Sequence, residues 1–134
     1  MRMQLNKNEH QNDPGVQKYA VPPLLKDQFG RIFNYLRIAV NEICNLRCIY
    51  CMPEEGVPFK PSKELLTHDE IIRFIQVAAE LGVNKIRFTG GEPLLRKDLV
   101  QLISGVSSIP KIRSVHLTTN GILLQGLASE LKGA

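Results

Sequence analysis

The stretch THDEIIRFIQVAAELGVNKIRFT, residues 67–89, predicts a helix followed closely by a strand. Thr67 and Glu70 have the spacing of a capping box, and apolar residues then recur every three or four positions until Gly82, a residue type that commonly ends helices. From residue 84 onward apolar and polar residues alternate, as they do in a strand. A helix that leads directly into a strand is typical of an α/β fold.

The same alternation of element types extends in both directions along the chain. We expect strands at residues 34–40, 84–89 and 113–119, and helices at residues 67–81, 96–106 and 123–132. Such an order implies right-handed crossovers and a parallel sheet, which is either part of a barrel or a small doubly wound sheet. We therefore predict three βα units over residues 34–134, preceded by a polar, proline-containing N-terminal arm at residues 1–33.

Composition narrows the classes of function. The chain has 134 residues, of which 43% are apolar, enough for one domain with a core. Its net charge of +4 suits a small anionic ligand better than nucleic acid. No stretch approaches the ~18 continuous apolar residues of a membrane span, and the first residues contain no apolar signal region. We expect a cytoplasmic protein with no membrane and no nucleic acid partner.

Three cysteines, Cys44, Cys48 and Cys51, lie within the segment EICNLRCIYCMPEEG, residues 42–56, and the chain has no others. They follow the first predicted strand, and loops at the carboxyl ends of parallel strands are where α/β proteins bind ligands. An odd number in so short a segment argues against a disulfide framework and against scattered core cysteines. The pattern favours metal ligation or redox chemistry.

Two kinds of metal site fit three thiolates. A zinc ion could bind them together with His68 or a water molecule, although structural zinc prefers four protein ligands in paired spacing. A [4Fe-4S] cluster is normally held by four thiolates, so three would leave one iron open to an outside ligand. The amino and carboxylate groups of S-adenosylmethionine can chelate such an iron, and we favour this second interpretation.

A second motif, Gly90-Gly91-Glu92-Pro93, follows the second predicted strand. Taken alone, it also fits an ordinary turn from a strand to a helix. Two glycines let the backbone come close to a ligand, and the Glu92 carboxylate can receive an ammonium group. The motif is therefore a candidate binding element for the amino group of a ligand.

Polar residues occupy one phase of the predicted strands. Arg37, Arg87 and Thr118 alternate with apolar positions and are expected to share the face that helices do not cover. This face could simply be solvated, or each arginine could pair with an internal carboxylate. A planar guanidinium suits phosphate oxygens and purine edges, so the functional alternative is a nucleotide site. Arg96 and Lys97, in contrast, are expected to be surface charges.

The cysteine spacing, with Tyr50 directly before Cys51, resembles the signature of the radical S-adenosylmethionine superfamily. Most of residues 36–134 is similar to the N-terminal portion of one family within it, the molybdenum-cofactor biosynthesis protein A family of GTP 3',8-cyclases. The matching phrases are LRIAV, CNLRCIYCMPEEGV, LLTHDEI, ELGVNKIRFTGGEPLLRKDL and LTTNGILL.

The resemblance implies a fold, cofactors and a reaction. The fold would be the N-terminal half, three βα units, of a partial TIM barrel. With a [4Fe-4S] cluster, S-adenosylmethionine and an electron donor, family members form a 5'-deoxyadenosyl radical that converts GTP to 3',8-cyclo-7,8-dihydro-GTP. The implied site residues are three cluster ligands, three contacts to S-adenosylmethionine and three contacts to GTP: Cys44, Cys48 and Cys51; Tyr50, Gly91 and Glu92; Arg37, Arg87 and Thr118.

The chain departs from the family in two places. Glu42 and Ile43 occupy the positions where members usually have Asp-Arg. The sequence also stops at Ala134, whereas members continue into further barrel units and a second cluster. Besides the cyclase we therefore keep two alternatives, a cluster-binding domain without catalysis and a radical enzyme with another substrate. A second chain that completes the barrel is one candidate partner.

Overall fold

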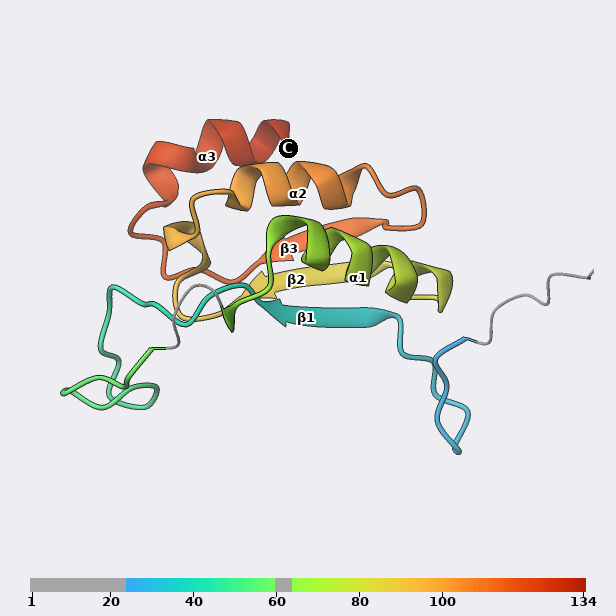
Figure 1. Ribbon diagram of the computed structural model, residues 1–134, viewed down its shortest axis with the longest axis horizontal. Coiled ribbons are helices and arrows are strands. Elements are labelled where there is room, and N and C mark those ends of the chain that lie inside the picture. Colours follow the sequence, from blue (N-terminus) through green and yellow to red (C-terminus); the bar gives the residue numbers. More distant parts are fainter. Residues whose placement is uncertain (1–23, 60–63) are drawn as a thin grey trace, which may run out of the picture.

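The computed structural model describes residues 24–59 and 64–134, so most of the predicted N-terminal arm lies outside the described residues. Three parallel strands, β1 (Tyr35–Ala39), β2 (Lys85–Thr89) and β3 (Ser114–Leu117), form one sheet in the order β1-β2-β3. The predicted α/β class and the parallel sheet are confirmed. The strands all end at the same edge of the sheet (Figure 1), so the loops that follow them lie close together.

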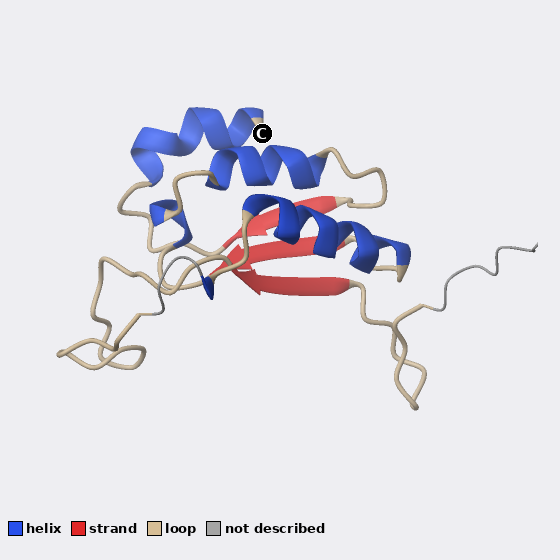
Figure 2. Ribbon diagram, viewed as in Figure 1, coloured by secondary structure: helices blue, strands red, loops and turns tan. Residues whose placement is uncertain are grey.

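The helices lie on one side of this sheet (Figure 1). Three α-helices, α1 (His68–Glu80), α2 (Leu99–Ser107) and α3 (Leu124–Gly133), alternate with the strands, and a short 3-10 helix, η2 (Pro93–Leu95), precedes α2. Figure 2 shows α1 and α2 next to the sheet and α3 beside α2. In the described part of the chain the other face of the sheet carries no helix. None of the helices described has the length and apolar character needed to cross a membrane.

The covered face of the sheet forms the core. Ile38, Ile86 and Phe88 are buried there and pack in one cluster with buried residues of α1 and α2. Fully burying a side chain of this size contributes about 1.5–3 kcal/mol to folding. These strand residues belong to the apolar phase predicted from the sequence. The polar phase is therefore left on the uncovered face.

Helix α1 lies where the sequence predicts it. The Thr67 hydroxyl accepts a hydrogen bond from the Glu70 N–H (3.3 Å), and the Glu70 carboxylate accepts one from the Thr67 N–H (2.8 Å). This capping box satisfies N–H groups that the first helical turn leaves unpaired. Ile71 and Ile75 are buried on its inner side, and Gly82, with a φ of 98°, turns the chain toward β2.

Helix α2 starts later than predicted. The sequence predicts a helix from residue 96, but the backbone of Arg96 is extended, with a ψ of 118°. Its guanidinium donates to the carbonyl oxygens of Val40 (3.0 Å) and Leu66 (3.2 Å). The same group also binds the Asp98 carboxylate (2.8 Å). The prediction that Arg96 is a surface charge is wrong, because its side chain is only 12% exposed and joins the segments that contain Val40, Leu66 and Asp98. Lys97 is exposed, as predicted.

The last ten residues of the predicted arm lie within the described part of the chain. The Leu25 N–H donates to the carbonyl oxygen of Leu81 at the end of α1 (3.0 Å), and Lys26 and Ile32 form an isolated antiparallel bridge. This end of the arm is thus fixed to the body near the amino ends of the strands. The domain boundary between residues 33 and 34 stays a prediction.

Candidate functional site

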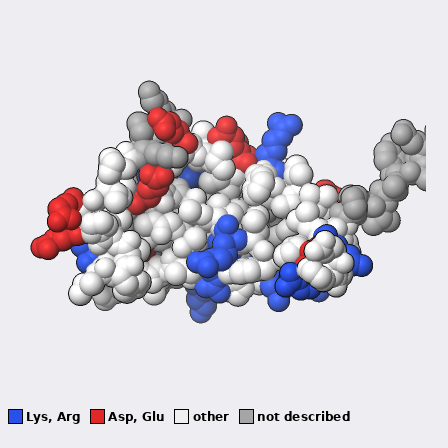
Figure 3. Space-filling model, turned by 90° about the horizontal axis from the view of Figure 1, so that it is seen from below, with Lys and Arg blue, Asp and Glu red and all other residues white. Residues whose placement is uncertain are grey.

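The uncovered face of the sheet carries the predicted polar residues. Arg37 and Arg87 are register partners on β1 and β2, and Thr118 directly follows β3. Arg87 donates from Nη1 to Thr118 Oγ1 (3.3 Å) and from Nε to the Tyr35 hydroxyl (2.6 Å). Figure 3, seen from below, shows Lys and Arg side chains standing across this side of the molecule. The structure therefore brings Arg37, Arg87 and Thr118 to one face.

The structure does not support the alternative in which each of these two arginines pairs with an internal carboxylate. Within residues 24–59 and 64–134 neither Arg37 nor Arg87 makes a salt bridge. Arg37 is exposed and Arg87 is half-buried. Of the readings left open by the sequence, a solvated face and an anion site both remain compatible with this arrangement.

The cysteines lie in the long loop between β1 and α1, as predicted. Cys44 and Cys48 are half-buried, Cys51 is exposed, and all three thiols are free. The N–H groups of Cys51 (2.9 Å) and Met52 (3.1 Å) donate to the carbonyl oxygen of Cys48, so the last two cysteines flank a tight turn. Arg47 Nη1 donates to the carbonyl oxygen of Cys44 (3.1 Å). All three thiols thus belong to one loop at the edge where the strands end.

The donor set suits an iron–sulfur cluster, although the thiols do not converge. Among the residues that the structure describes, no three Cys, His, Asp or Glu side chains lie close enough together to hold a metal ion. His68, the candidate fourth zinc ligand, instead lies with its Nδ1 3.5 Å from Asp98 Oδ2. Thiolates are the usual ligands of a [4Fe-4S] cluster, and this loop supplies three of the usual four. The chemistry of the donors therefore fits a cluster with one open iron.

Gly90 and Gly91 allow two loops to approach closely. Gly90 has a φ of 142°, which L side chains rarely adopt. A Cβ on Gly91 would lie 2.6 Å from the carbonyl oxygen of Glu42 and closer still to that of Ile43. The Gly91 N–H donates to the carbonyl oxygen of Asn41 (3.1 Å). The backbone that these glycines admit is the loop leading to the cysteines.

The Glu92 carboxylate is enclosed, since the residue is 1% exposed. Its Oε1 accepts from the Leu94 N–H (2.9 Å) and the Thr119 hydroxyl (2.7 Å), and its Oε2 accepts from the Asn120 N–H (2.8 Å). Three donors use most of the accepting capacity of a carboxylate. In this conformation the buried carboxylate joins the loop after β2 to the loop after β3 through these hydrogen bonds. Its contact with a ligand's ammonium group stays a prediction.

Asn41, just past the end of β1, carries an acceptor that is not used. The residue is buried, and its Nδ2 donates to the carbonyl oxygen of Glu92 (3.0 Å). Its Oδ1 has no hydrogen-bond partner in the described part of the chain, and a Cβ on Gly90 would lie 3.1 Å from it. Leaving a buried acceptor unpaired costs about 1–3 kcal/mol. This edge of the sheet therefore contains an unpaired acceptor, which the protein encloses in this conformation.

Tyr50 lies in the turn before the last cysteine. It is 93% exposed, and its neighbour Ile49 is fully exposed. This part of the loop packs against nothing in the described residues. The predicted contact of Tyr50 with S-adenosylmethionine is therefore neither supported nor opposed by a neighbouring side chain.

A salt bridge braces the start of the cysteine loop. Arg96 holds the carbonyl oxygen of Val40, the residue after β1, and its hydrogen bonds to Asp98 keep the pKa of that carboxyl below its ordinary value of 3.8. The charge of Arg96 adds to this effect. An ionised Asp98 thus keeps Arg96 in the position from which it binds the loop.

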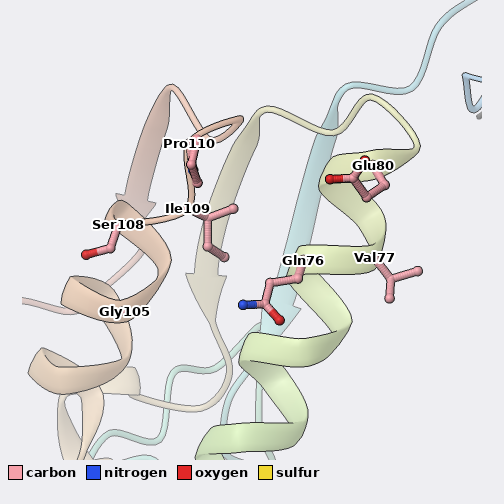
Figure 4. A pocket seen from close by; sticks show the side chains of 7 residues that line it. All are labelled: Gln76, Val77, Glu80, Gly105, Ser108, Ile109 and Pro110. Atoms are coloured by element: carbon pink, nitrogen blue, oxygen red, sulfur yellow. The ribbon is translucent and has the colours of Figure 1, made fainter. Parts of the chain in front are cut away.

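The hollow between α1 and α2 lies away from these residues. It has a volume of about 480 Å³. Its lining, shown in Figure 4, comes from the second half of α1, from the last turns of α2 and from the residues directly after α2: Gln76, Val77, Glu80, Gly105, Ser108, Ile109 and Pro110. This end of α1 leads into the amino end of β2, opposite the edge that carries the cysteines. The candidate site is accordingly the uncovered sheet face and the cysteine loop, not this hollow.

The family model of the Radical SAM superfamily matches residues 38–134, which include the cysteine loop, the glycine motif and all three βα units except the start of β1. The chain belongs to the radical SAM superfamily. The resemblance that the cysteine spacing indicates is thereby confirmed. Membership implies a [4Fe-4S] cluster and S-adenosylmethionine as the cofactors of this radical SAM chain.

The names of several relatives agree with the more specific resemblance. A GTP 3',8-cyclase of Listeria welshimeri is 50% identical over 111 residues, which are 83% of this chain and 33% of the relative. A GTP 3',8-cyclase of Alkaliphilus metalliredigens is 48% identical over 110 residues, 82% of this chain and 34% of the relative. Molybdenum cofactor biosynthesis protein moc-5 of Caenorhabditis elegans is 49% identical over 113 residues, which are 84% of this chain and 19% of the relative. The radical SAM chain thus spans about a third of the length of its bacterial relatives.

Sequence reasoning missed four side chains that support the site of this radical SAM chain: Tyr35, Asn45, Thr119 and Asn120. Asn120 Nδ2 donates to Asn45 Oδ1 (2.8 Å) and joins the loop after β3 to the cysteine loop. Some signals were present: Tyr35 shares the strand phase of Arg37, and Asn120-Gly121 is a turn dipeptide at the edge where the cysteines lie. Periodicity places such residues at the edge, but it does not predict which of them form hydrogen bonds with one another.

Proposed function

We propose that this chain is the cluster-bearing portion of a GTP 3',8-cyclase that acts in molybdenum cofactor biosynthesis. The names of its relatives support this substrate and this pathway. The observation that carries the proposal is the group formed by Arg37, Arg87 and Thr118 on the uncovered sheet face, at the edge of which the cysteine loop begins. A radical enzyme that acts on a nucleotide needs an anion-binding face beside its cluster.

Cys44, Cys48 and Cys51 are the proposed ligands of the [4Fe-4S] cluster. Three free thiols in one loop, in a superfamily that binds such clusters, support this assignment. When bound, the cluster and S-adenosylmethionine supply the one-electron chemistry that removes a hydrogen atom from the ribose of GTP. The contribution of the chain is to hold three thiolates and leave the fourth position to the cofactor.

Tyr50, Gly91 and Glu92 are the proposed contacts to S-adenosylmethionine. The glycine motif follows β2 at the same edge of the sheet as the cysteine loop, and this neighbourhood supports the placing of the ammonium group there. Because its carboxylate is already bonded to three donors, Glu92 contributes mainly through the shape that it gives the loop. Tyr50 is free to close over a ligand, since its ring is exposed.

Arg37, Arg87 and Thr118 are the proposed contacts to GTP. Arginine binds phosphate oxygens through two parallel hydrogen bonds, and neither arginine is neutralised by a carboxylate in the described residues. Tyr35 and Thr118 accept hydrogen bonds from Arg87 and so orient its guanidinium on the open face. An electron donor and the remaining part of the barrel, from the same protein or a second chain, complete the proposed system.

The activity is tested with the chain together with the remaining part of the barrel, in one longer protein or as a second chain. The protein is reconstituted anaerobically with iron and sulfide, reduced, and supplied with S-adenosylmethionine and GTP. Mass spectrometry of the products should detect 5'-deoxyadenosine and a cyclised nucleotide, both dependent on GTP. Formation of 5'-deoxyadenosine without any dependence on GTP would point to another substrate. A cluster that gives no 5'-deoxyadenosine would instead favour a binding domain without catalysis.

The GTP site is tested separately by calorimetric titration of the chain. Replacing Arg87→Ala removes a charged hydrogen-bond donor and should raise the dissociation constant for GTP about 10-fold to 100-fold. Arg73→Ala is the matched control, because Arg73 is an exposed residue of α1 on the helical side. If the two variants lost affinity equally, GTP would be attracted only by net charge and the assigned face would be wrong.

A further inference from the structure

The loops after β1, β2 and β3 meet around one buried carboxylate. Glu92, in the loop after β2, accepts hydrogen bonds from the Thr119 hydroxyl (2.7 Å) and from the Asn120 N–H (2.8 Å), both in the loop after β3. Its own N–H donates to the carbonyl oxygen of Ile43 (2.7 Å) in the loop after β1. Hydrogen bonds to a buried carboxylate are stronger than those between neutral groups. Glu92 therefore fixes the loop after β3 relative to the cysteine loop.

The side chain of Asn120 extends this connection to the cysteine loop. Its Nδ2 donates to Asn45 Oδ1 (2.8 Å), and its Oδ1 accepts from the Ile122 N–H (3.1 Å). Because one end of the amide donates and the other accepts, turning it over would break both hydrogen bonds. Asn120 thus presents its donor to Asn45 in a defined orientation.

Cys44 is held on both sides by these bonds, in contrast to the other cysteines. Ile43 precedes it and is bound by Glu92, and Asn45 follows it and is bound by Asn120. The backbone hydrogen bonds around Cys48 and Cys51 are local, within the turn that ends at Met52. The first thiol therefore has a fixed place relative to the sheet, and the other two lie on a separate turn.

We infer that Asn120 is a positioning residue, which fixes Cys44 through Asn45 and thereby sets where the cluster sits relative to the sheet face. This inference rests on the proposed function, since it requires that the three thiolates bind a cluster. Asn120 touches neither the cluster nor a substrate in this role. Its loss should loosen one ligand and leave the chain folded, because both asparagine side chains are exposed.

The test uses four variants of the anaerobically reconstituted chain: Asn120→Ala, Asn45→Ala, the double variant, and Asn45→Asp, which keeps an acceptor for Asn120 Nδ2. Release of iron to a ferrous chelator is timed, and the electron paramagnetic resonance spectrum of the reduced cluster is recorded. Each single alanine variant should release iron about threefold to tenfold faster than the parent, the effect of one lost hydrogen bond. The double variant should release iron no faster than either single variant, because both changes remove the same hydrogen bond.

Two controls separate positioning from general stability. Asn34→Ala changes an exposed asparagine before β1 and should leave iron release at the parent rate, and Asn45→Asp should restore a rate near the parent's. The urea midpoint of the iron-free chain should shift little in every variant. Parent-like iron release and an unchanged spectrum in both alanine variants, or fully additive effects, would overturn the inference alone. A parent chain that holds no iron would overturn the proposed function together with it.

Discussion

Gly91 has no room for a side chain. A Cβ there would meet the carbonyl oxygens of Glu42 and Ile43, and these belong to backbone that cannot turn aside as a flexible side chain would. We expect Gly91→Ala to destabilise the chain by about 1–3 kcal/mol, the usual cost of forcing extra atoms into a packed site. Urea unfolding of the iron-free chain measures this difference.

Gly126→Ala is the control for that substitution. Gly126 lies within α3, and a Cβ there meets nothing within 4 Å. Alanine at an exposed helical position should stabilise the chain by about 0.5–1 kcal/mol. A stabilised Gly91→Ala variant would contradict the close approach of the two loops.

At the level of single elements, how far the sequence predicts the structure depends on what ends each element. Helix α1 could be predicted because its capping box and its final glycine are local signals, and the structure contains both. The start of α2 could not, because Arg96 is held by Val40, Leu66 and Asp98, and two of these partners are distant in the sequence. Periodicity does not reveal a side chain that is needed elsewhere in the fold.

The bond between Arg96 and Asp98 should make the stability of this region depend on pH. Since the native state lowers the pKa of Asp98 below its ordinary value of 3.8, the stabilising effect is present above that pH and is lost as the pH falls through the lowered value. Asp98→Asn should lower the melting temperature by about 2–5 °C near neutral pH. The expected shift is this small because the Asp98 side chain is 40% exposed and water screens its interaction with Arg96.

Differential scanning calorimetry at several pH values checks this expectation. The difference between the parent and Asp98→Asn should shrink as the pH falls below about 3.8 and toward the lowered pKa of Asp98, where the parent carboxyl also becomes neutral. A difference that stays constant over the whole range would mean that the charge of Asp98 does not hold Arg96 in place.

Helices α1 and α3 should contribute unequally to stability. Helix α1 has four buried residues, whereas α3 has none and packs beside α2 with partly buried side chains such as Leu127. Ile75→Ala should cost about 2–5 kcal/mol, and Leu127→Ala about 1 kcal/mol or less. Hydrogen exchange should likewise be faster in α3 than in α1. Equal costs and equal exchange would contradict the described packing of α3.

For the whole molecule, the sheet face could be predicted better than the connections behind it. Arg37, Arg87 and Thr118 share a face because strand residues alternate, and alternation is visible in one sequence. The hydrogen bond between Asn45 and Asn120 joins residues that are 75 positions apart, and only the fold shows that these loops meet. The sequence thus indicates which chemistry is present, and the structure shows how the loops that carry it are tied together.

The open form of the molecule bears on how well it can act alone. Within the described residues β1 and β3 each have one unpaired edge, and the face with the two arginines is open to water. Charged hydrogen bonds are weaker in such a setting than in an enclosed site. We therefore expect GTP to bind this chain more weakly than it binds a complete barrel. The proposed iron–sulfur chemistry should depend less on enclosure, since its proposed ligands come from a single loop.

The central claim is that the three thiolates of this loop hold a [4Fe-4S] cluster. Its most direct test is the iron, sulfide and zinc content of the chain after anaerobic reconstitution, for the parent and for Cys44→Ser, Cys48→Ser and Cys51→Ser. We predict about four irons and four sulfides per parent chain, and little of either in each variant. A parent chain that retains zinc, or that binds no more iron than its serine variants, would contradict the claim.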